Sequence, residues 1–273
     1  MRLAATDGNP RAQFEIALHY TEGKGVTADL AKAAEWYRLA AEGSLAPAQY
    51  RLGSFYEKGR GVVRDLAEAR KWYQRAADQE NVKVMHNLAV LLADGALGKP
   101  DFARAARWFE KAAHRGVRDS QFNLGVLYAR GLGVKKDLSA FYKWFAIAAK
   151  LGDGDAAAKH DEIANSMPQD QLVNARKAVS SWNEKAINED ANRVESDAAW
   201  KGKPADAASA ADMGLVKQAQ LLLGNFGFDP GPADGVAGPK TLEAIRTFQS
   251  REGLPVNGAV DKKLIRALAS RMI

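Results

Sequence analysis

Four tryptophans recur every 36 residues, and this period constrains the fold more than any other feature of the sequence. They are Trp36, Trp72, Trp108 and Trp144, and each is followed by Tyr or Phe and then by an Ala-Ala pair. A unit that recurs at such a period must bury its apolar face against its neighbour. The period therefore predicts an all-α stack of helical hairpins, which offers an extended surface for binding.

Other landmarks share the same period. An aspartate precedes each tryptophan helix and is expected to cap its amino end. Glycine pairs are expected to end the first helix of three units at positive φ. A small residue lets the paired helices approach closely. The aspartates are Asp29, Asp65, Asp101 and Asp137; the glycines are Gly23 and Gly25, Gly59 and Gly61, Gly131 and Gly133; the small residues are Ala17, Gly53, Ala89 and Gly125.

The third unit departs from this pattern. The segment Asp94-Gly95-Ala96-Leu97-Gly98 replaces the glycine pair, and Leu92 stands where other units have tyrosine. We expect a different loop there, while the 36-residue spacing of the helices is kept.

Two interpretations of the repeated residues are possible. The aromatic ladder could be a stacking platform for bases or sugars, and the aspartates could perform acid chemistry. Alternatively, the aromatic residues form an interlocking core and the aspartates are caps. We favour the second interpretation in both cases.

The combined pattern A-x-x-L-G-x-x-Y, G-x-G-V-x-x-D and A-x-x-W-Y-x-x-A-A resembles the Sel1-like repeat, a short relative of the tetratricopeptide repeat. The resemblance implies a solenoid that binds other proteins. We assign it to residues 1–186. Its expected closing helices span Asp155 to Ala164 and Pro168 to Lys185. Arg2-Leu3-Ala4-Ala5 repeats Arg38-Leu39-Ala40-Ala41, so the chain is expected to start mid-repeat, as a fragment of a longer protein.

A linker and a second small domain follow. Residues 187–213 are rich in Ala, Asp and Ser, contain Pro204 and Trp200, and predict a partly helical tether. Residues 214–273 predict three short helices around one core, with Pro239 at a first helical position and Asp261 as a cap. The expected core residues are Val216, Ala219, Leu222, Leu223, Leu242, Ile245, Phe248, Leu264, Ile265 and Leu268.

This second domain resembles the helical peptidoglycan-binding domain of bacterial cell-wall enzymes. The shared pattern is V-x-x-x-Q-x-x-L, G-x-x-x-G-P-x-D-G-x-x-G-P-x-T, A-x-x-x-F-Q and G-L-x-x-x-G, with Ala237 where an aromatic residue is common. Peptidoglycan is then the expected ligand; a folded relative without glycan affinity is the alternative. The candidate residues are polar groups expected to be exposed beside the glycine turns, with backbone amides: Asp234, Gly235, Gly238, Thr241, Arg246 and Gln249.

Composition argues against several other functions. The net charge of +6 is spread along the chain without a nucleic-acid-binding module, so nucleic acid is not an expected partner. The absence of cysteine removes thiol chemistry. The four histidines make no zinc motif, and no serine-nucleophile or phosphate-loop motif is present. We therefore expect no catalytic residues, metal or cofactor, and no apolar run reaches membrane-helix length.

The expected function is that of a non-enzymatic periplasmic scaffold. Sel1-like repeats followed by such a terminal domain resemble the periplasmic region of bacterial polar localisation factors, in which a cytoplasmic coiled coil and a membrane helix precede the repeats. That resemblance implies a membrane-anchored parent and periplasmic partners such as ectodomains of polar signalling proteins. The alternatives are the targeting region of a peptidoglycan hydrolase and a Sel1-like regulator with a vestigial wall-binding domain.

Overall fold

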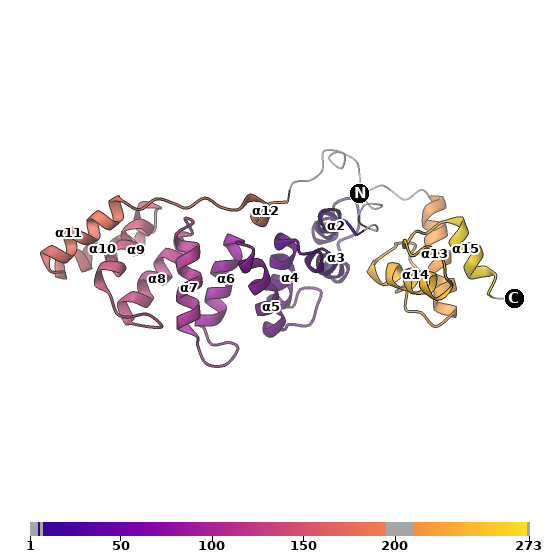
Figure 1. Cartoon of the computed structure of the whole chain (residues 1–273), viewed down its shortest axis with the longest axis horizontal. Coiled ribbons are helices and arrows are strands. Elements are labelled where there is room, and N and C mark those ends of the chain that lie inside the picture. Colours follow the sequence, from indigo (N-terminus) through magenta and orange to yellow (C-terminus); the bar gives the residue numbers. More distant parts are fainter. Residues whose placement is uncertain (1–4, 6–7, 195–209, 272–273) are drawn as a thin grey trace. The chain divides into compact units, whose positions relative to one another are not determined.

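The computed structural model describes residues 5, 8–194 and 210–271, and helices account for most of them (Figure 1). The described chain divides into two compact units. The first unit comprises the chain up to Arg64 together with the segment from Val194 onward, and the second unit spans Asp65–Arg193. The expected all-α class is confirmed, with the hairpin repeats and a small helical domain at the carboxyl end.

The solenoid helices alternate along the chain as the repeat predicts. The first unit holds α2, α3 and α4, and the second holds α5 to α11. Their bounds are α2 Pro10–Glu22, α3 Leu30–Glu42, α4 Ala46–Lys58, α5 Leu66–Asp78, α6 Val82–Ala93, α7 Phe102–Ala113, α8 Arg118–Arg130, α9 Leu138–Lys150, α10 Gly154–Ser166 and α11 Gln169–Ser180. Within each hairpin the short loop makes the two helices neighbours.

The expected caps are confirmed at each tryptophan helix. Asp29, Asp65, Asp101 and Asp137 are the N-cap residues of α3, α5, α7 and α9, and each carboxylate accepts first-turn amide hydrogens. Each bond satisfies a donor that a helix end leaves without an intrahelical partner. The four aspartates are therefore explained by local structure.

The glycine pairs adopt the expected left-handed backbone in the first, second and fourth repeats. The second glycine of the pair also allows close packing between repeats. A β-carbon on Gly133 would lie 2.2 Å from the carbonyl carbon of Phe102, and one on Gly61 would lie 2.2 Å from the Leu30 oxygen. The third repeat has Leu97 at this position, and its loop turns instead at Gly95 and Gly98, as the sequence indicated.

The aromatic ladder is core, which confirms the interpretation favoured above. The four tryptophans are between 3 % and 8 % exposed, and the following Tyr37 and Tyr73 are fully buried. Basic side chains cover the outer ring faces in the second unit. Arg75, Lys111 and Lys143 lie 4.7, 4.2 and 4.6 Å from the ring centroids of Trp72, Trp108 and Trp144. Their ring faces are thereby occupied by the protein itself.

Three buried glutamines join successive hairpins, and the sequence interpretation missed them. Gln13, Gln49 and Gln121 lie 36 or 72 residues apart, and each Nε2 donates to a carbonyl eight residues upstream. Their common period was visible in the sequence, and it would have identified them as part of the repeat.

The closing helices differ from the expectation at their carboxyl end. α10 and α11 are present, but α11 ends at Ser180, five residues before the expected end at Lys185. Residues 182–188 have no regular secondary structure and run back along the second unit to the short helix α12, Glu189–Asn192 (Figure 1). Residues 187–193, expected to be tether, therefore belong to the second unit.

The carboxyl-terminal domain contains the three expected helices, α13 Ala210–Asn225, α14 Pro239–Arg251 and α15 Lys262–Ala269. Pro239 opens α14, and Asp261 caps α15 by accepting the Leu264 amide hydrogen. The core consists of Ala219, Leu222, Leu223, Ala244, Ile245, Phe248, Leu264, Ile265 and Leu268. The predictions for Arg2-Leu3-Ala4, Trp200 and Pro204 fall outside the described residues.

Candidate functional site

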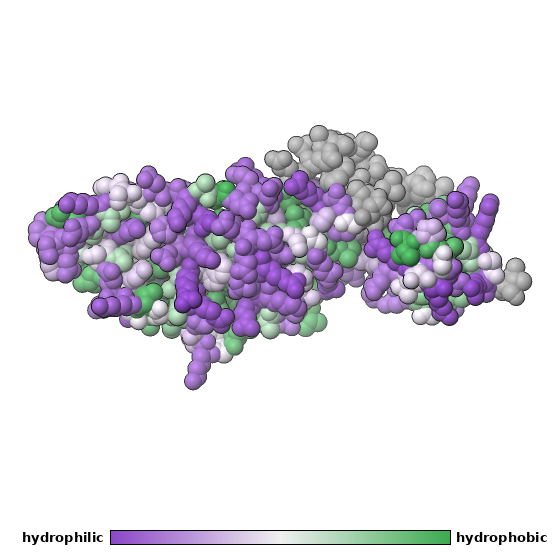
Figure 2. Space-filling model, viewed as in Figure 1, coloured by the Kyte–Doolittle hydropathy of each residue, from purple (hydrophilic) through white to green (hydrophobic). Residues whose placement is uncertain are grey.

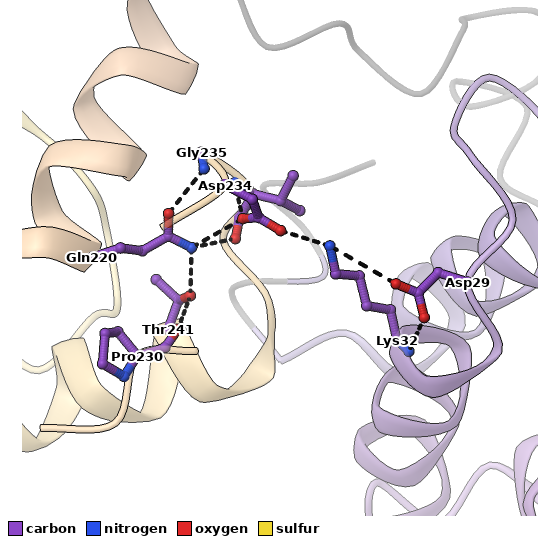
Figure 3. A network of polar contacts seen from close by, with 8 residues as sticks. Asp29, Lys32, Gln220, Pro230, Asp234, Gly235 and Thr241 are labelled. Carbon is purple, nitrogen blue, oxygen red and sulfur yellow. Dashed lines mark hydrogen bonds and ion pairs between the residues drawn. The ribbon is translucent and has the colours of Figure 1, made fainter. Parts of the chain in front are cut away.

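Gln220 organises the glycine-rich loop of the carboxyl-terminal domain (Figure 3). Its Nε2 donates to Thr241 Oγ1, to the Val236 carbonyl and to Asp234 Oδ1 at 3.1, 2.9 and 3.2 Å. Its Oε1 accepts the Gly235 amide hydrogen at 2.9 Å. The side chain is 2 % exposed, so these bonds replace the water that it lost on burial. One glutamine on α13 thereby holds the loop between α13 and α14.

Gln249 plays the same part for the loop after α14. Its Oε1 accepts the amide hydrogens of Asn257 and Gly258, and its Nε2 donates to Asn257 Oδ1 at 2.8 Å. Asn257 Oδ1 also accepts the Ala259 amide hydrogen. The glutamine of each sequence motif, Gln220 or Gln249, therefore has a buried side-chain amide that hydrogen-bonds to the backbone groups of a loop.

Thr241 and Gln249 are buried, so the prediction that their side chains are exposed is wrong. Thr241 is 1 % exposed and donates its hydroxyl to the Pro230 carbonyl, and Gln249 is 5 % exposed. Their polar atoms bond inside the domain, so these two residues shape the loops. Gly235 is also buried, whereas Gly238 precedes α14 as its N-cap.

Among the candidates, Asp234 has an oxygen that is directed away from the domain core. Its Oδ1 accepts from Val236 and Gln220, while its Oδ2 lies 2.6 Å from the Lys32 ammonium of the first unit (Figure 3). Partial burial would raise the pKa of Asp234, but the hydrogen bonds from Lys32, Val236 and Gln220 outweigh it and lower that pKa. Arg246, on α14, lies beside Gly258 and is half-buried. Asp234 therefore presents a negative charge that can accept a cationic donor.

The surface of the same domain also carries apolar side chains. Leu221 on α13 and Val256 in the loop after α14 are 54 % and 56 % exposed. Figure 2 shows hydrophobic residues among hydrophilic ones on the visible face of this domain. Single exposed apolar residues of this kind are common on protein surfaces and do not by themselves indicate a binding site.

The histidines serve local packing. His86 Nδ1 lies 2.8 Å from Ser120 Oγ, His114 packs edge-on against Trp144, His160 packs on Tyr142, and His19 meets the Lys24 carbonyl. Within the part of the chain that the structure describes, no group of three or more His, Asp or Glu side chains is placed to hold a metal ion. The described helices are also too short or too polar to cross a membrane.

His86 makes stability depend on pH. Burial lowers its pKa, and Asp119 opposes this shift. The unfolded chain then binds the proton more readily, so the stabilisation is present above about pH 6.5 and is lost as the pH falls through the lowered pKa.

Phe14 and Phe122 occupy the position of His86 in the first and fourth repeats. We expect His86→Phe to reduce the pH dependence of the unfolding free energy between about pH 5 and 7, by a fraction of the ~1.4 kcal/mol that one pKa unit represents. Urea titrations across that range would show it; an unchanged slope would contradict the assignment.

Comparisons with known proteins agree with this architecture. The Sel1 repeat family model matches residues 10–45, 46–81, 82–117 and 118–153. The model of the family described as "Putative peptidoglycan binding domain" matches residues 213–268. A Sel1 repeat protein from Oxalobacter formigenes, known from its crystal structure, is 32 % identical with a TM-score of 0.54, covering 64 % of this chain and 71 % of that one.

Two further matches concern the fold alone or a short stretch of the sequence. The c5321 protective antigen of uropathogenic Escherichia coli strains, which displays an SLR fold, is 22 % identical, with a TM-score of 0.56 over 99 % of this chain and 59 % of that one. This likeness concerns the fold alone. The localisation factor PodJL of Caulobacter vibrioides is 38 % identical over 65 residues, which are 24 % of this chain and 6 % of that protein. The match thus spans a small part of the curated relative.

The fold and the repeated caps define a class, the solenoid proteins built from short helical hairpins. Because the four repeat matches together cover more than half of the chain, its family is established as well. The chain belongs to the Sel1 repeat family, and its carboxyl end carries a domain of the peptidoglycan-binding type. Such a domain is typical of proteins of the cell envelope.

Proposed function

We propose that this protein is a non-enzymatic periplasmic scaffold that binds partner proteins through its Sel1 solenoid and the cell wall through its carboxyl-terminal domain. The observation that carries the proposal is the presence of both modules in one chain. Joining two weak binding modules raises the effective concentration of each at the other's site. A scaffold of this kind would hold partner proteins next to the wall.

The cell pole is the proposed location of this scaffold. Support comes from the local similarity to the localisation factor PodJL, which is 38 % identical over 65 residues. The proposed partners are therefore periplasmic ectodomains of polar signalling proteins. A membrane anchor in the parent protein would keep the solenoid within reach of both the membrane and the wall.

The wall-binding site is proposed to lie on the loops that Gln220 and Gln249 hold. Arg246 would meet carboxylates, Asp234 Oδ2 would accept a donor from a stem peptide or sugar in place of Lys32, and the backbone around Gly238 would allow close approach of the ligand. The domain has eight Lys or Arg residues against five Asp or Glu from residue 214 onward, so attraction to stem-peptide carboxylates adds a salt-screened contribution.

Co-sedimentation with purified sacculi tests the wall-binding assignment. We expect the full chain to pellet with sacculi and a chain lacking residues 214–273 to stay in the supernatant. Added salt should weaken the retention, because part of the attraction is electrostatic. Equal pelleting of the two chains would contradict the assignment. The same incubation tests the non-enzymatic proposal, since release of soluble wall fragments into the supernatant would contradict it.

A further inference from the structure

The segment that follows α11, residues 182–193, lies along the second unit as a strap. It leaves the end of α11, runs in extended conformation and ends in the four-residue helix α12 (Figure 1). Most of its side chains are exposed. Its attachment to the solenoid therefore rests on a few specific contacts, which lie at two successive inter-repeat turns.

The first contact is at the turn between the third and fourth repeats. The Lys185 amide donates to the carbonyl of His114, the C-cap residue of α7, at 2.8 Å. The neighbouring Glu184 carboxyl group lies against Gly116, where a β-carbon would be 2.5 Å from it. Gly116 has φ +78°, so glycine suits both the turn and the close approach of the strap.

The second contact is at the preceding turn, 36 residues earlier, and it is made by α12. The buried Asn81 donates its Nδ2 to the Ala191 carbonyl. Asn192 contacts the turn backbone on both sides: its Nδ2 donates to the Glu80 carbonyl at 3.1 Å, and its Oδ1 accepts the Val82 amide hydrogen at 2.8 Å. The Val82 amide is a first-turn donor of α6, which has no intrahelical acceptor.

The two contacts match the geometry of the repeat. Between Lys185 and Asn192 the chain advances seven residues, of which four steps are extended and three lie in α12, and together they span roughly 18 Å. Two helices packed about 8–10 Å apart give a repeat of roughly 16–20 Å, so an extended chain with a short terminal turn bridges one repeat. The solenoid contributes mainly backbone groups to these contacts, namely the His114 and Glu80 carbonyls and the Val82 amide. Backbone groups of this kind recur at every turn and recognise extended polypeptide irrespective of most side chains.

We propose that the row of inter-repeat turns in the second unit is a docking face for an extended polypeptide segment, which the strap occupies in cis. The partner is a protein segment that ends in a short turn with asparagine in the place of Asn192, and it binds by displacing the strap. This inference rests on the proposed role of the solenoid in binding proteins. To that role it adds which face of the solenoid binds, what type of segment binds there, and how the strap controls access to the face.

A strap-release experiment tests the proposal in the full chain. Ala191 is 4 % exposed, so Ala191→Arg has no room for its side chain and should evict α12. The probe is a fluorescent peptide of residues 181–194, and its matched control carries Asn192→Ala. We expect the unaltered peptide to bind the Ala191→Arg chain at least tenfold more tightly than the wild-type chain. The control peptide should bind the Ala191→Arg chain at least tenfold more weakly than the unaltered one.

Hydrogen exchange at the Val82 amide reports directly on the strap. Exchange should accelerate in the Ala191→Arg chain and slow again when the unaltered peptide is added. Asn192→Ala in the full chain provides a second, milder release, in case the arginine disturbs the fold. The proposal is wrong if a released chain binds neither peptide, if both peptides bind equally, or if the Val82 amide stays protected in both variants. Retention on sacculi should be unchanged in these variants, so failure here is distinguishable from failure of the wall-binding proposal.

Discussion

Replacing Gly133 by alanine is expected to destabilise the second unit by roughly 3 kcal/mol or more. Two costs combine at this position. A left-handed backbone costs a residue with a β-carbon about 1–2 kcal/mol, and φ here is +69°. The added β-carbon would also lie 2.2 Å from the Phe102 carbonyl carbon, so the turn of the fourth repeat must move away from the start of α7. Such overpacking typically costs a further 1–3 kcal/mol. Urea unfolding followed by tryptophan fluorescence would measure the loss.

Gly25 provides the matched control for this prediction. It occupies the same repeat position with φ +70°, but no atom of the described residues lies within 4 Å of the place of its β-carbon. Gly25→Ala should therefore cost only the backbone term of about 1–2 kcal/mol. Gly61, whose β-carbon would lie 2.2 Å from the Leu30 oxygen, should behave like Gly133. Equal losses at Gly25 and Gly133 would show that close packing between repeats is not what requires glycine.

Gln220→Ala is expected to have the largest effect on the carboxyl-terminal domain. It removes the acceptor of the Gly235 amide and the donor to Val236, Asp234 and Thr241 at once. Thr241 and Asp234 keep other bonds, but the Gly235 amide and the Val236 carbonyl lose these partners. Each such loss costs about 1–3 kcal/mol, so we expect a total of roughly 3 kcal/mol. The loop that carries Asp234 would lose its support, and retention on sacculi should fall at least tenfold.

Gln218→Ala is the control for this second prediction. Gln218 is the same residue type on the same helix, α13, and is exposed. Its replacement should leave both the melting transition of the domain and retention on sacculi nearly unchanged. If Gln220→Ala destabilises the domain while sacculi still retain the protein fully, the wall contact does not depend on the α13–α14 loop. Normal stability in Gln220→Ala would contradict the structural role of the network itself.

Much of the solenoid was predictable because its determinants are local. An aspartate at Asp29 or Asp137 satisfies amides within three residues, and a glycine at Gly23 adopts its own left-handed conformation. Such preferences depend on neighbours in the chain, so a repeated pattern reveals them four times over. The same reasoning located Pro239 and Asp261 at the starts of two helices in the terminal domain.

The candidate wall-binding site was predicted less completely. The motif indicated the loops, but it assigned exposure to Thr241 and Gln249, which are buried. A polar residue in a conspicuous motif can be a ligand contact or a buried support, and residue type alone does not separate the two roles. Which of the two roles a polar residue has depends on the atoms that pack around its side chain. The bonds of Gln249 to Asn257 and Gly258 illustrate this.

The sequence by itself determined the 36-residue hairpin, its caps, its aromatic core and the three-helix terminal domain, because these follow from local backbone preference and periodic burial. Only the tertiary structure decided that Gly61 and Gly133 pack tightly against the preceding hairpin, and that the expected tether begins as a strap docked on the second unit. Asn81 and Ala191 lie 110 residues apart in the chain, and their bond depends on how the stacked repeats bring their turns into one row. Such long-range pairings arise from the geometry of the assembled stack, which no short stretch of sequence encodes.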